Sequence, residues 1–221
     1  MRKIKGAAFI SLDGVIQAPG GPTEDPTGGF GHGGWLAPIG DMEAFEPIGR
    51  LFGGPFDLLL GRRTYDIFAA YWPYAGEEEA EIRDRFNACT KYVLTQGDQP
   101  LEWDKSIRLG GMDALAEVRA GDGPDLVIQG SSTIYPQLLE ANLLDELTLM
   151  IFPVVLGRGK RLFGDGTPAR GLEVTEKTVT SRGTAVITYR PTGPVDTAAI
   201  TPPSASEREE ARQQAMAEGR W

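Results

Sequence analysis

Cysteine and histidine are nearly missing from this chain of 221 residues, which contains one of each. The single cysteine, Cys89, excludes an internal disulfide framework and is typical of a reducing compartment. The single histidine, His32, is followed by two glycines, and no C-x-x-C pair accompanies it. We therefore expect no metal site.

Positive charge and long apolar runs are also scarce. Lysine and arginine total 22 against 31 aspartates and glutamates, a formal net charge of −9, which argues against a nucleic-acid or acidic-membrane partner. No apolar stretch approaches a membrane span, and the first residues lack the apolar region of a signal peptide. We expect a cytoplasmic protein that binds small molecules, in which an anionic ligand would need a local group of arginines.

What the chain does contain is an ordinary globular composition, with 41% hydrophobic and 24% charged residues. Its end differs from the rest. Residues 191–203 are rich in proline and threonine, and residues 204–218 are rich in charge and alanine. We interpret 191–221 as a linker and a peripheral helix, with a capping box from Ser204 to Glu207.

Residues 125–159 predict a strand, a turn, a helix and a second strand. The apolar run 126–128 predicts a buried strand, and 146–155 predicts the other. Between them, Gly130 and two serines form a turn, and Ser131 or Ser132 would cap the helix. In a βαβ unit this turn lies where α/β sheets bind ligands, and helix-start N–H groups favour a phosphate. The alternative is that small residues merely turn the chain.

The same device occurs earlier in the chain. The apolar strand 57–60 runs into Gly-Arg-Arg-Thr at 61–64, and two guanidinium groups there suit an anion. The alternative is a pair of exposed arginines at a helix start. The first strand, from Ile4, ends near Ser11 and Asp13, where a substrate could reach both side chains. From these residues alone the simpler interpretation is that Asp13 only caps a turn.

The segment 17–40 is a long loop rich in glycine and proline. It holds His32 and the aromatic residues Phe30 and Trp35. It could close over a ligand and exclude water, or it could be a solvated loop with Trp35 packed on the core. The sequence leaves both possibilities open.

Four segments follow one another in a fixed order: SLDGVI at 11–16, DLLLGRRT at 57–64, LVIQGSSTI at 126–134, and LDEL at 144–147 followed by PVVLGRG at 153–159. Together they resemble the C-terminal reductase domain of bacterial riboflavin deaminase-reductases, within the dihydrofolate-reductase-like superfamily. The resemblance covers about residues 2 to 190 and implies one domain over 1–190. It implies a three-layer α/β sandwich with a central mixed, mainly parallel sheet, and NADPH across the carboxyl ends of the strands.

The resemblance also implies which residues contact the cofactor. It places Leu94 and Thr95 near the adenosine, and Ile16 near the nicotinamide. Ser11 and Asp13 would approach the nicotinamide and the substrate as catalytic residues. The phosphates and the pyrophosphate would be held by two groups of four residues: Gly61, Arg62, Arg63 and Thr64, and Gly130, Ser131, Ser132 and Thr133.

The chain departs from the family pattern in three ways. A serine follows Gly130 where the family has a glycine pair, and the zinc deaminase half is absent. No carboxylate matches the acid that dihydrofolate reductases use near the pterin. Asp41 and Glu43 are candidates by location only, and we group Asp41 with Trp35 and His32 as predicted substrate or lid residues.

These patterns lead to three hypotheses. The first is an NADPH-dependent reductase that transfers hydride to a small heterocyclic or carbonyl substrate, similar to 5-amino-6-(5-phosphoribosylamino)uracil reductase or dihydrofolate reductase. The second is a non-catalytic nucleotide-binding or stress-related protein that keeps the fold. The third is a structural module that forms dimers. In each case we expect a homodimer.

Overall fold

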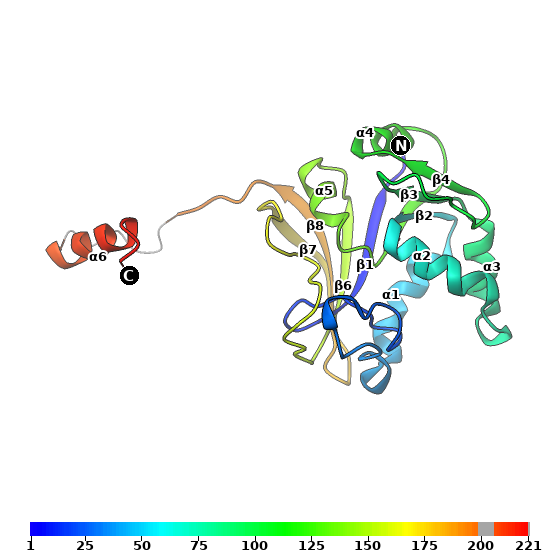
Figure 1. The fold of residues 1–221 in the computed structure, drawn as a ribbon, viewed down its shortest axis with the longest axis horizontal. Coiled ribbons are helices and arrows are strands. Elements are labelled where there is room, and N and C mark those ends of the chain that lie inside the picture. Colours follow the sequence, from blue (N-terminus) through cyan, green and yellow to red (C-terminus); the bar gives the residue numbers. More distant parts are fainter. Residues whose placement is uncertain (199–205, 221) are drawn as a thin grey trace.

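A computed structural model describes residues 1–198 and 206–220 of the protein. Within these residues the chain forms an eight-stranded sheet of order β4-β3-β2-β5-β1-β6-β8-β7 (Figure 1). The neighbours from β4 to β6 are parallel, whereas β8 is antiparallel to both β6 and β7. The strands are β1 (Ile4–Ser11), β2 (Phe56–Gly61), β3 (Lys91–Leu94), β4 (Ser106–Leu109), β5 (Asp125–Gln129), β6 (Glu146–Phe152), β7 (Gly171–Val179) and β8 (Ala185–Gly193).

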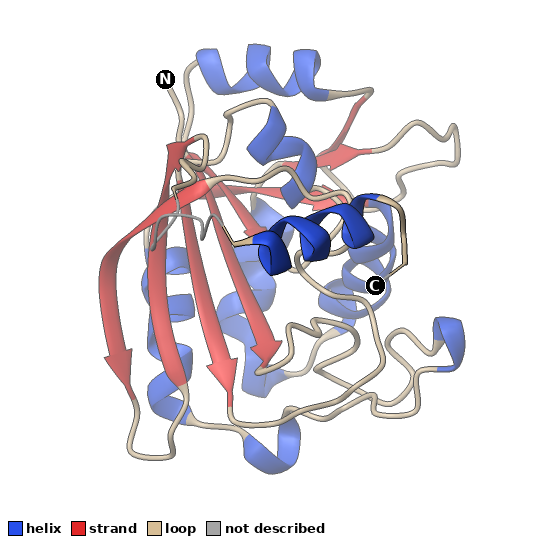
Figure 2. Ribbon diagram, turned by 90° about the vertical axis from the view of Figure 1, so that its left-hand side faces the viewer, coloured by secondary structure: helices blue, strands red, loops and turns tan. Residues whose placement is uncertain are grey.

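Helices cover both faces of the sheet (Figure 2). The α-helices are α1 (Met42–Gly53), α2 (Arg62–Tyr71), α3 (Ala80–Ala88), α4 (Met112–Ala120), α5 (Tyr135–Glu140) and α6 (Glu207–Ala217). Four 3-10 turns accompany them: η1 (Thr27–Gly29), η2 (Ala37–Ile39), η3 (Trp72–Tyr74) and η4 (Glu77–Glu79). No helix within residues 1–198 and 206–220 is long and apolar enough to cross a membrane.

Three consecutive leucines in β2 point alternately to the two faces of the sheet, and both faces are buried. Leu58 and Leu60 pack with side chains from α1, α2 and α3, and Leu59 packs with side chains from α4 and α5. All three leucines are fully buried. Successive side chains of a strand point to opposite faces, so a continuous apolar run requires a layer of helices on each side. The predicted fold class, a three-layer α/β sandwich with a mixed, mainly parallel sheet, is confirmed.

The element boundaries differ from the predicted ones in several places. The second strand of the 125–159 unit ends at Phe152, and the last strand ends at Gly193, just beyond the predicted domain boundary at residue 190. In α6 the N-cap is Ser206, whose side chain accepts a hydrogen bond from the Glu209 N–H. Ser204 of the predicted capping box, with the rest of 199–205, lies outside the described residues.

A buried ion pair fixes the amino-terminal edge of the sheet. The Arg2 guanidinium pairs with the Asp57 carboxylate at the start of β2, and the two side chains are 3% and 10% exposed. Arg2 also donates hydrogen bonds to the Pro124 carbonyl and the Tyr92 hydroxyl, and the other Asp57 oxygen accepts from the Thr90 N–H at 2.9 Å. These bonds connect β2, β3 and the segment before β5, at the end of the sheet opposite the carboxyl ends of the strands.

Candidate active site

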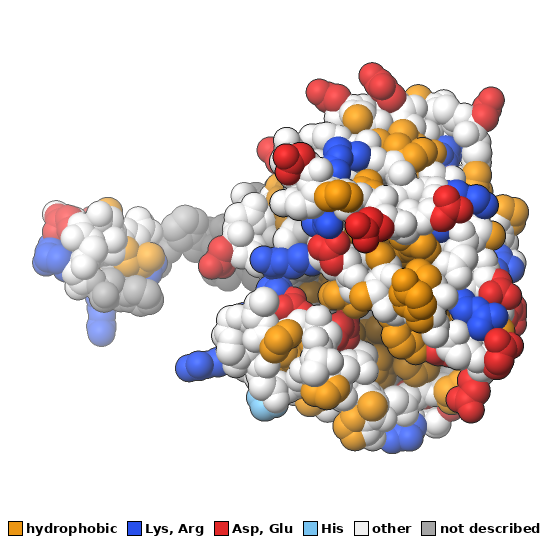
Figure 3. Space-filling model, turned by 45° about the vertical axis from the view of Figure 1, so that its right-hand side comes forward, with side chains coloured by type: hydrophobic (Ala, Val, Ile, Leu, Met, Phe, Trp, Pro, Cys, Tyr) orange, Lys and Arg blue, Asp and Glu red, His pale blue; other side chains and the backbone are white. Residues whose placement is uncertain are grey.

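A cleft of about 940 Å³ lies at the carboxyl ends of the parallel strands. Figure 3 shows apolar side chains gathered around a hollow in this face of the molecule. The ends of β1, β2, β3 and β5 contribute to its wall, as expected for a ligand site in an open α/β sheet. All residues predicted to contact the cofactor line this one cleft: Ile16, Gly61, Arg62, Arg63, Thr64, Leu94, Thr95, Gly130, Ser131, Ser132 and Thr133.

The two glycine turns contact each other because β2 and β5 are neighbours in the sheet. The Gly61 N–H donates a hydrogen bond to the Ser131 hydroxyl at 2.9 Å. Gly130 has φ 82°, and a Cβ built on it would lie 3.6 Å from the Thr64 side chain. Ser131 also has a positive φ, of 59°. A turn in this left-handed conformation accounts for the glycine at 130.

The predicted capping role of Ser131 or Ser132 is wrong. Helix α5 begins at Tyr135, its N-cap is Ile134, and no side chain caps it. The Ser131 hydroxyl is instead used between the two turns, where it accepts from Gly61. The sequence could not show this contact, because its partner lies 70 residues away along the chain.

The two arginines at the start of α2 differ in their surroundings. The Arg62 guanidinium pairs with Asp66 at 2.9 Å and donates to the Gln99 carbonyl at 3.0 Å. The hydrogen bond to Asp66 raises the pKa of Arg62, which stays charged, and the Asp66 carboxylate already compensates this charge within the helix. Arg63 is exposed and makes no hydrogen bond or ion pair with any residue in the described part of the chain. Arg63 is therefore the cation that remains available to an anionic ligand.

Part of the cleft was not predicted from the sequence. Residues 17–21 and 23–25 of the long loop form one wall, and Lys160 lies beside them. Phe68, Tyr71 and Trp72 form the opposite wall. One face of α2 lines the cleft with Thr64, Ile67, Phe68 and Tyr71. Their helical spacing is visible in the sequence and could have predicted this face. The loop wall offered no such signal, because it has no regular period.

Glu24 is the carboxylate in the loop wall whose titration is perturbed by burial. Its side chain accepts hydrogen bonds from the Gly20 N–H at 2.7 Å and the Gly21 N–H at 3.2 Å. Burial nevertheless raises the pKa of Glu24, against the lowering effect of these two hydrogen bonds. Its neighbour Asp25 pairs with the Lys160 ammonium group. The cleft thus contains a carboxyl group that takes up a proton more readily than an exposed glutamate.

Ser11 and Asp13, the predicted catalytic residues, do not line the cleft. The Asp13 carboxylate accepts hydrogen bonds from the Leu156 N–H at 3.0 Å, the Gly157 N–H at 2.8 Å and the Ser11 hydroxyl at 2.7 Å. These bonds, led by the one from Leu156, lower the pKa of Asp13 to about 2. A carboxylate held in this way stays charged and anchors the segment after β6. In the structure the pair therefore holds the segment after β6, outside the cleft.

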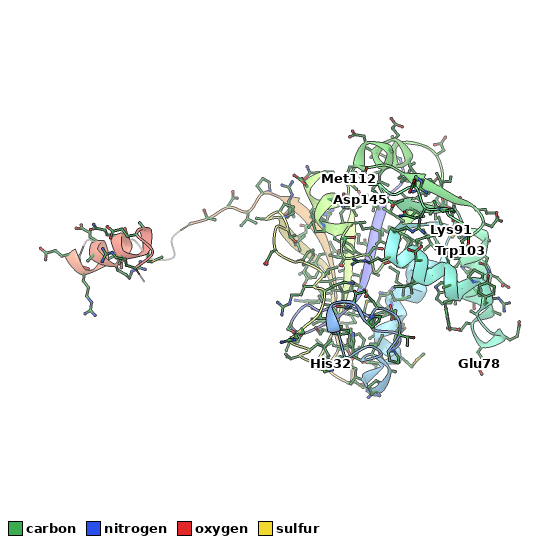
Figure 4. The ribbon with its side chains drawn as sticks, in the orientation of Figure 1. His32, Glu78, Lys91, Trp103, Met112 and Asp145 are labelled. Atoms are coloured by element: carbon green, nitrogen blue, oxygen red, sulfur yellow. The ribbon has the colours of Figure 1, made fainter. Side chains whose placement is uncertain are left out.

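His32, Trp35 and Asp41, the predicted substrate or lid residues, also lie outside the cleft. His32 is exposed at the edge of the molecule (Figure 4). Trp35 is buried in the core and donates from Nε1 to the Gln17 carbonyl at 3.0 Å. Asp41 is the N-cap of α1, and a hydrogen bond from the Thr180 hydroxyl contributes most to lowering its pKa. Of the long loop, residues 17–21 and 23–25 and Leu36 line the cleft, whereas residues 30–35 do not.

The order of the strands and the cleft across their carboxyl ends define an α/β fold with a ligand site at the ends of its parallel strands. The chain belongs to the RibD C-terminal domain family, whose model matches residues 2–188. The resemblance noted in the sequence is thereby confirmed over nearly the whole predicted domain.

Individual relatives are distant. The uncharacterized protein YyaP of Bacillus subtilis (strain 168) is 23% identical over 184 residues, which cover 81% of this chain and 90% of that protein. A protein of Shewanella sp. PV-4 named for riboflavin biosynthesis has a TM-score of 0.63 at 22% identity, over 87% of this chain and 99% of its own. A pyrimidine reductase-like protein of Corynebacterium diphtheriae has a TM-score of 0.55 at 16% identity, over 86% and 92%. These two structures show the fold alone.

Proposed function

We propose that the protein is an NADPH-dependent reductase that transfers hydride to a small heterocyclic or carbonyl substrate. The observation that supports this most directly is the convergence of the two glycine turns and an unpaired arginine in one cleft. Membership in the RibD C-terminal domain family supports the same reaction class. The bound nicotinamide would supply the hydride, and the chain would supply orientation, charge and a proton.

The residues of the phosphate end fit a dinucleotide. Gly130 adopts a left-handed conformation, in which a side chain would be strained. A Cβ built on Gly61 would lie 3.4 Å from the Ile134 side chain, an ordinary contact distance. Ser132 and Thr133 would contribute hydroxyl and N–H donors to the pyrophosphate. Arg63 would hold the ribose phosphate that distinguishes NADPH from NADH. Leu94 and Thr95 line the part of the cleft next to β3, where the adenosine would lie.

We propose Glu24 as the group that delivers a proton to the substrate. It is a cleft carboxyl group whose pKa burial raises, and a carboxylic acid serves as a general acid only while it is protonated. The Gly20 and Gly21 N–H groups fix its position in the wall. Glu24 would thus take the role that the sequence left without a carboxylate.

Glu24→Gln tests the raised pKa without any knowledge of the substrate. A carboxyl group with a higher pKa in the folded state than in the unfolded state stabilises the fold at low pH, and this contribution is lost as pH rises through the folded pKa. The free energy of unfolding of the wild type should therefore fall, relative to Glu24→Gln, as pH rises from about 4 to neutrality. Urea unfolding of both proteins at several pH values measures this difference. A constant difference would contradict the raised pKa.

Titration of the full chain with NADPH and with NADH tests the proposed function. Trp72 lines the cleft and is one of four tryptophans, so the intrinsic fluorescence reports on binding. We expect saturable quenching by both cofactors, with the stronger affinity for NADPH. The proposal would be refuted if neither NADPH nor NADH bound to the protein.

A further inference from the structure

Helix α2 runs along the cleft, and the two ends of the helix contribute side chains of different chemistry. Arg63 lies in the first turn of the helix and Tyr71 in its last turn, and both line the cleft. Eight residues of α-helix span roughly 12 Å, at about 1.5 Å per residue. This distance separates the phosphate end, defined by Arg63 and the two glycine turns, from the far end, defined by Phe68, Tyr71, Trp72 and Glu79.

The far end presents aromatic rings that are held from behind. The rings of Trp72 and Phe86 lie 4.8 Å apart, and those of Tyr71 and Trp72 lie 5.2 Å apart. Phe68 stacks on Phe86 at 5.9 Å with an interplanar angle of 16°. Phe86 is fully buried, whereas Phe68 and Trp72 are half-buried and Tyr71 is 49% exposed. The rings are therefore fixed in place by the core while their outer surfaces remain open to a planar ligand.

The charges at the far end disfavour an anion. Glu79 lines the cleft and its carboxylate accepts a hydrogen bond from the Tyr71 hydroxyl. Lys160 lies against the loop wall, but Asp25 and the Thr27 hydroxyl already bind its ammonium group. The remaining cleft cations in the described chain, Arg62 and Arg63, begin α2 at the phosphate end. The formal net charge of −9 further disfavours an anion wherever no local cation is free to bind it.

We infer that the far end takes a planar aromatic or heterocyclic group that carries no phosphate and is neutral or cationic. This assignment rests on the proposed function, in which the dinucleotide fills the phosphate end. The inference excludes phosphorylated heterocycles as substrates. Their phosphate would need a free cation at the far end, where the cleft has the carboxylate of Glu79 instead.

Riboflavin and riboflavin 5′-phosphate form a matched pair of probes, because they share one planar ring system and differ by a phosphate. With the full chain saturated by NADP⁺, so that the phosphate end is filled, we expect riboflavin to bind at least about tenfold more tightly. Flavin fluorescence anisotropy measures both affinities. Equal or tighter binding of the phosphorylated flavin would overturn the inference, and so would a lack of riboflavin binding.

Two variants assign the binding to the far end. Tyr71→Ala should weaken riboflavin about 5- to 150-fold, since stacking of a heterocycle on an aromatic side chain accounts for an effect of this size. Tyr74→Ala is the matched control, because Tyr74 is 82% exposed and lies outside the cleft. Glu79→Lys should reduce the preference for riboflavin over its phosphate by about tenfold. Equal effects of the two tyrosine variants, or an unchanged preference in Glu79→Lys, would overturn the assignment.

The outcome is separable from that of the cofactor titration. If neither NADPH nor NADH binds, the proposed function fails, and the flavin pair is then compared on the protein without NADP⁺. A far end that still prefers riboflavin, and loses this preference in Glu79→Lys, would stand as a binding site for planar, unphosphorylated compounds. If NADPH binds and the flavin preference is absent, only the substrate assignment fails.

Discussion

Replacing Asp57 by alanine is expected to lower the free energy of unfolding by about 3–5 kcal/mol. The substitution removes the partner of a guanidinium group whose side chain is 3% exposed, so the Arg2 charge would remain buried without compensation. It also removes the acceptor of the N–H of Thr90, the residue before β3. Urea unfolding at neutral pH, followed by circular dichroism, measures the loss.

The exposed pair between Arg50 and Glu176 supplies the control. Its side chains are 57% and 63% exposed, so Glu176→Ala should cost under about 1 kcal/mol. The double variant Arg2→Met with Asp57→Leu should recover much of the stability lost in Asp57→Ala, because an apolar pair carries no desolvation cost. A loss in Asp57→Ala no larger than that in Glu176→Ala would show that the buried pair does not stabilise the edge of the sheet.

The strands could be predicted because buried strands of an α/β sheet are short apolar runs. Leu58 to Leu60 and the run 126–128 were both located to within a residue or two of β2 and β5. The order of the strands could not be derived from these runs. In the structure β1 lies between β5 and β6. The two strands of the unit from 125 to 159 are therefore not neighbours in the sheet, and the strand between them comes from more than a hundred residues earlier in the chain. The resemblance to a known family implied a mixed, mainly parallel sheet, but it gave no order of the strands.

In the candidate site too, the features that depend on neighbouring residues could be predicted, and those that depend on distant contacts could not. A glycine before a helix start is a local signal, and both glycine turns were found from it. The catalytic role predicted for Asp13 came from the resemblance to a known family, because its position at the end of a strand alone favoured a turn cap. Its actual partners, the N–H groups of Leu156 and Gly157, are 143 and 144 residues away. No pattern within residues 11–16 distinguishes an anchoring carboxylate from a reactive one.

Long-range packing determines which part of the loop from 17 to 40 lines the cleft and which part is buried in the core. Its glycines and aromatic residues suggested a lid at Phe30 to Trp35, but both aromatic side chains are buried in the core beside β1 and β6. The part that reaches the cleft is held by Gln17, whose side chain donates to the Asp25 and Thr27 carbonyls and accepts from the Lys160 N–H. Glu24, which we propose as the proton donor, lies within this part.

Replacing Arg63 by alanine is expected to weaken NADPH binding about 10- to 150-fold. A hydrogen bond between charged groups contributes about 1.5–3 kcal/mol, and about 1.4 kcal/mol corresponds to a tenfold change in affinity. NADH lacks the ribose phosphate, so its affinity should change far less. Fluorescence titration of the wild type and the variant with both cofactors measures the change, and added salt should reduce the preference of the wild type for NADPH.

Arg62→Ala is the matched control, because it removes the same group from the adjacent position of α2. The Arg62 guanidinium is already bound by Asp66 and by the Gln99 carbonyl, so this substitution should weaken NADPH less than Arg63→Ala does. Equal loss of NADPH and NADH in Arg63→Ala would mean that Arg63 serves the pyrophosphate that both cofactors share. A stronger effect of Arg62→Ala on NADPH alone would mean that the cofactor phosphate displaces Asp66, and that the unpaired state of Arg63 does not decide cofactor preference.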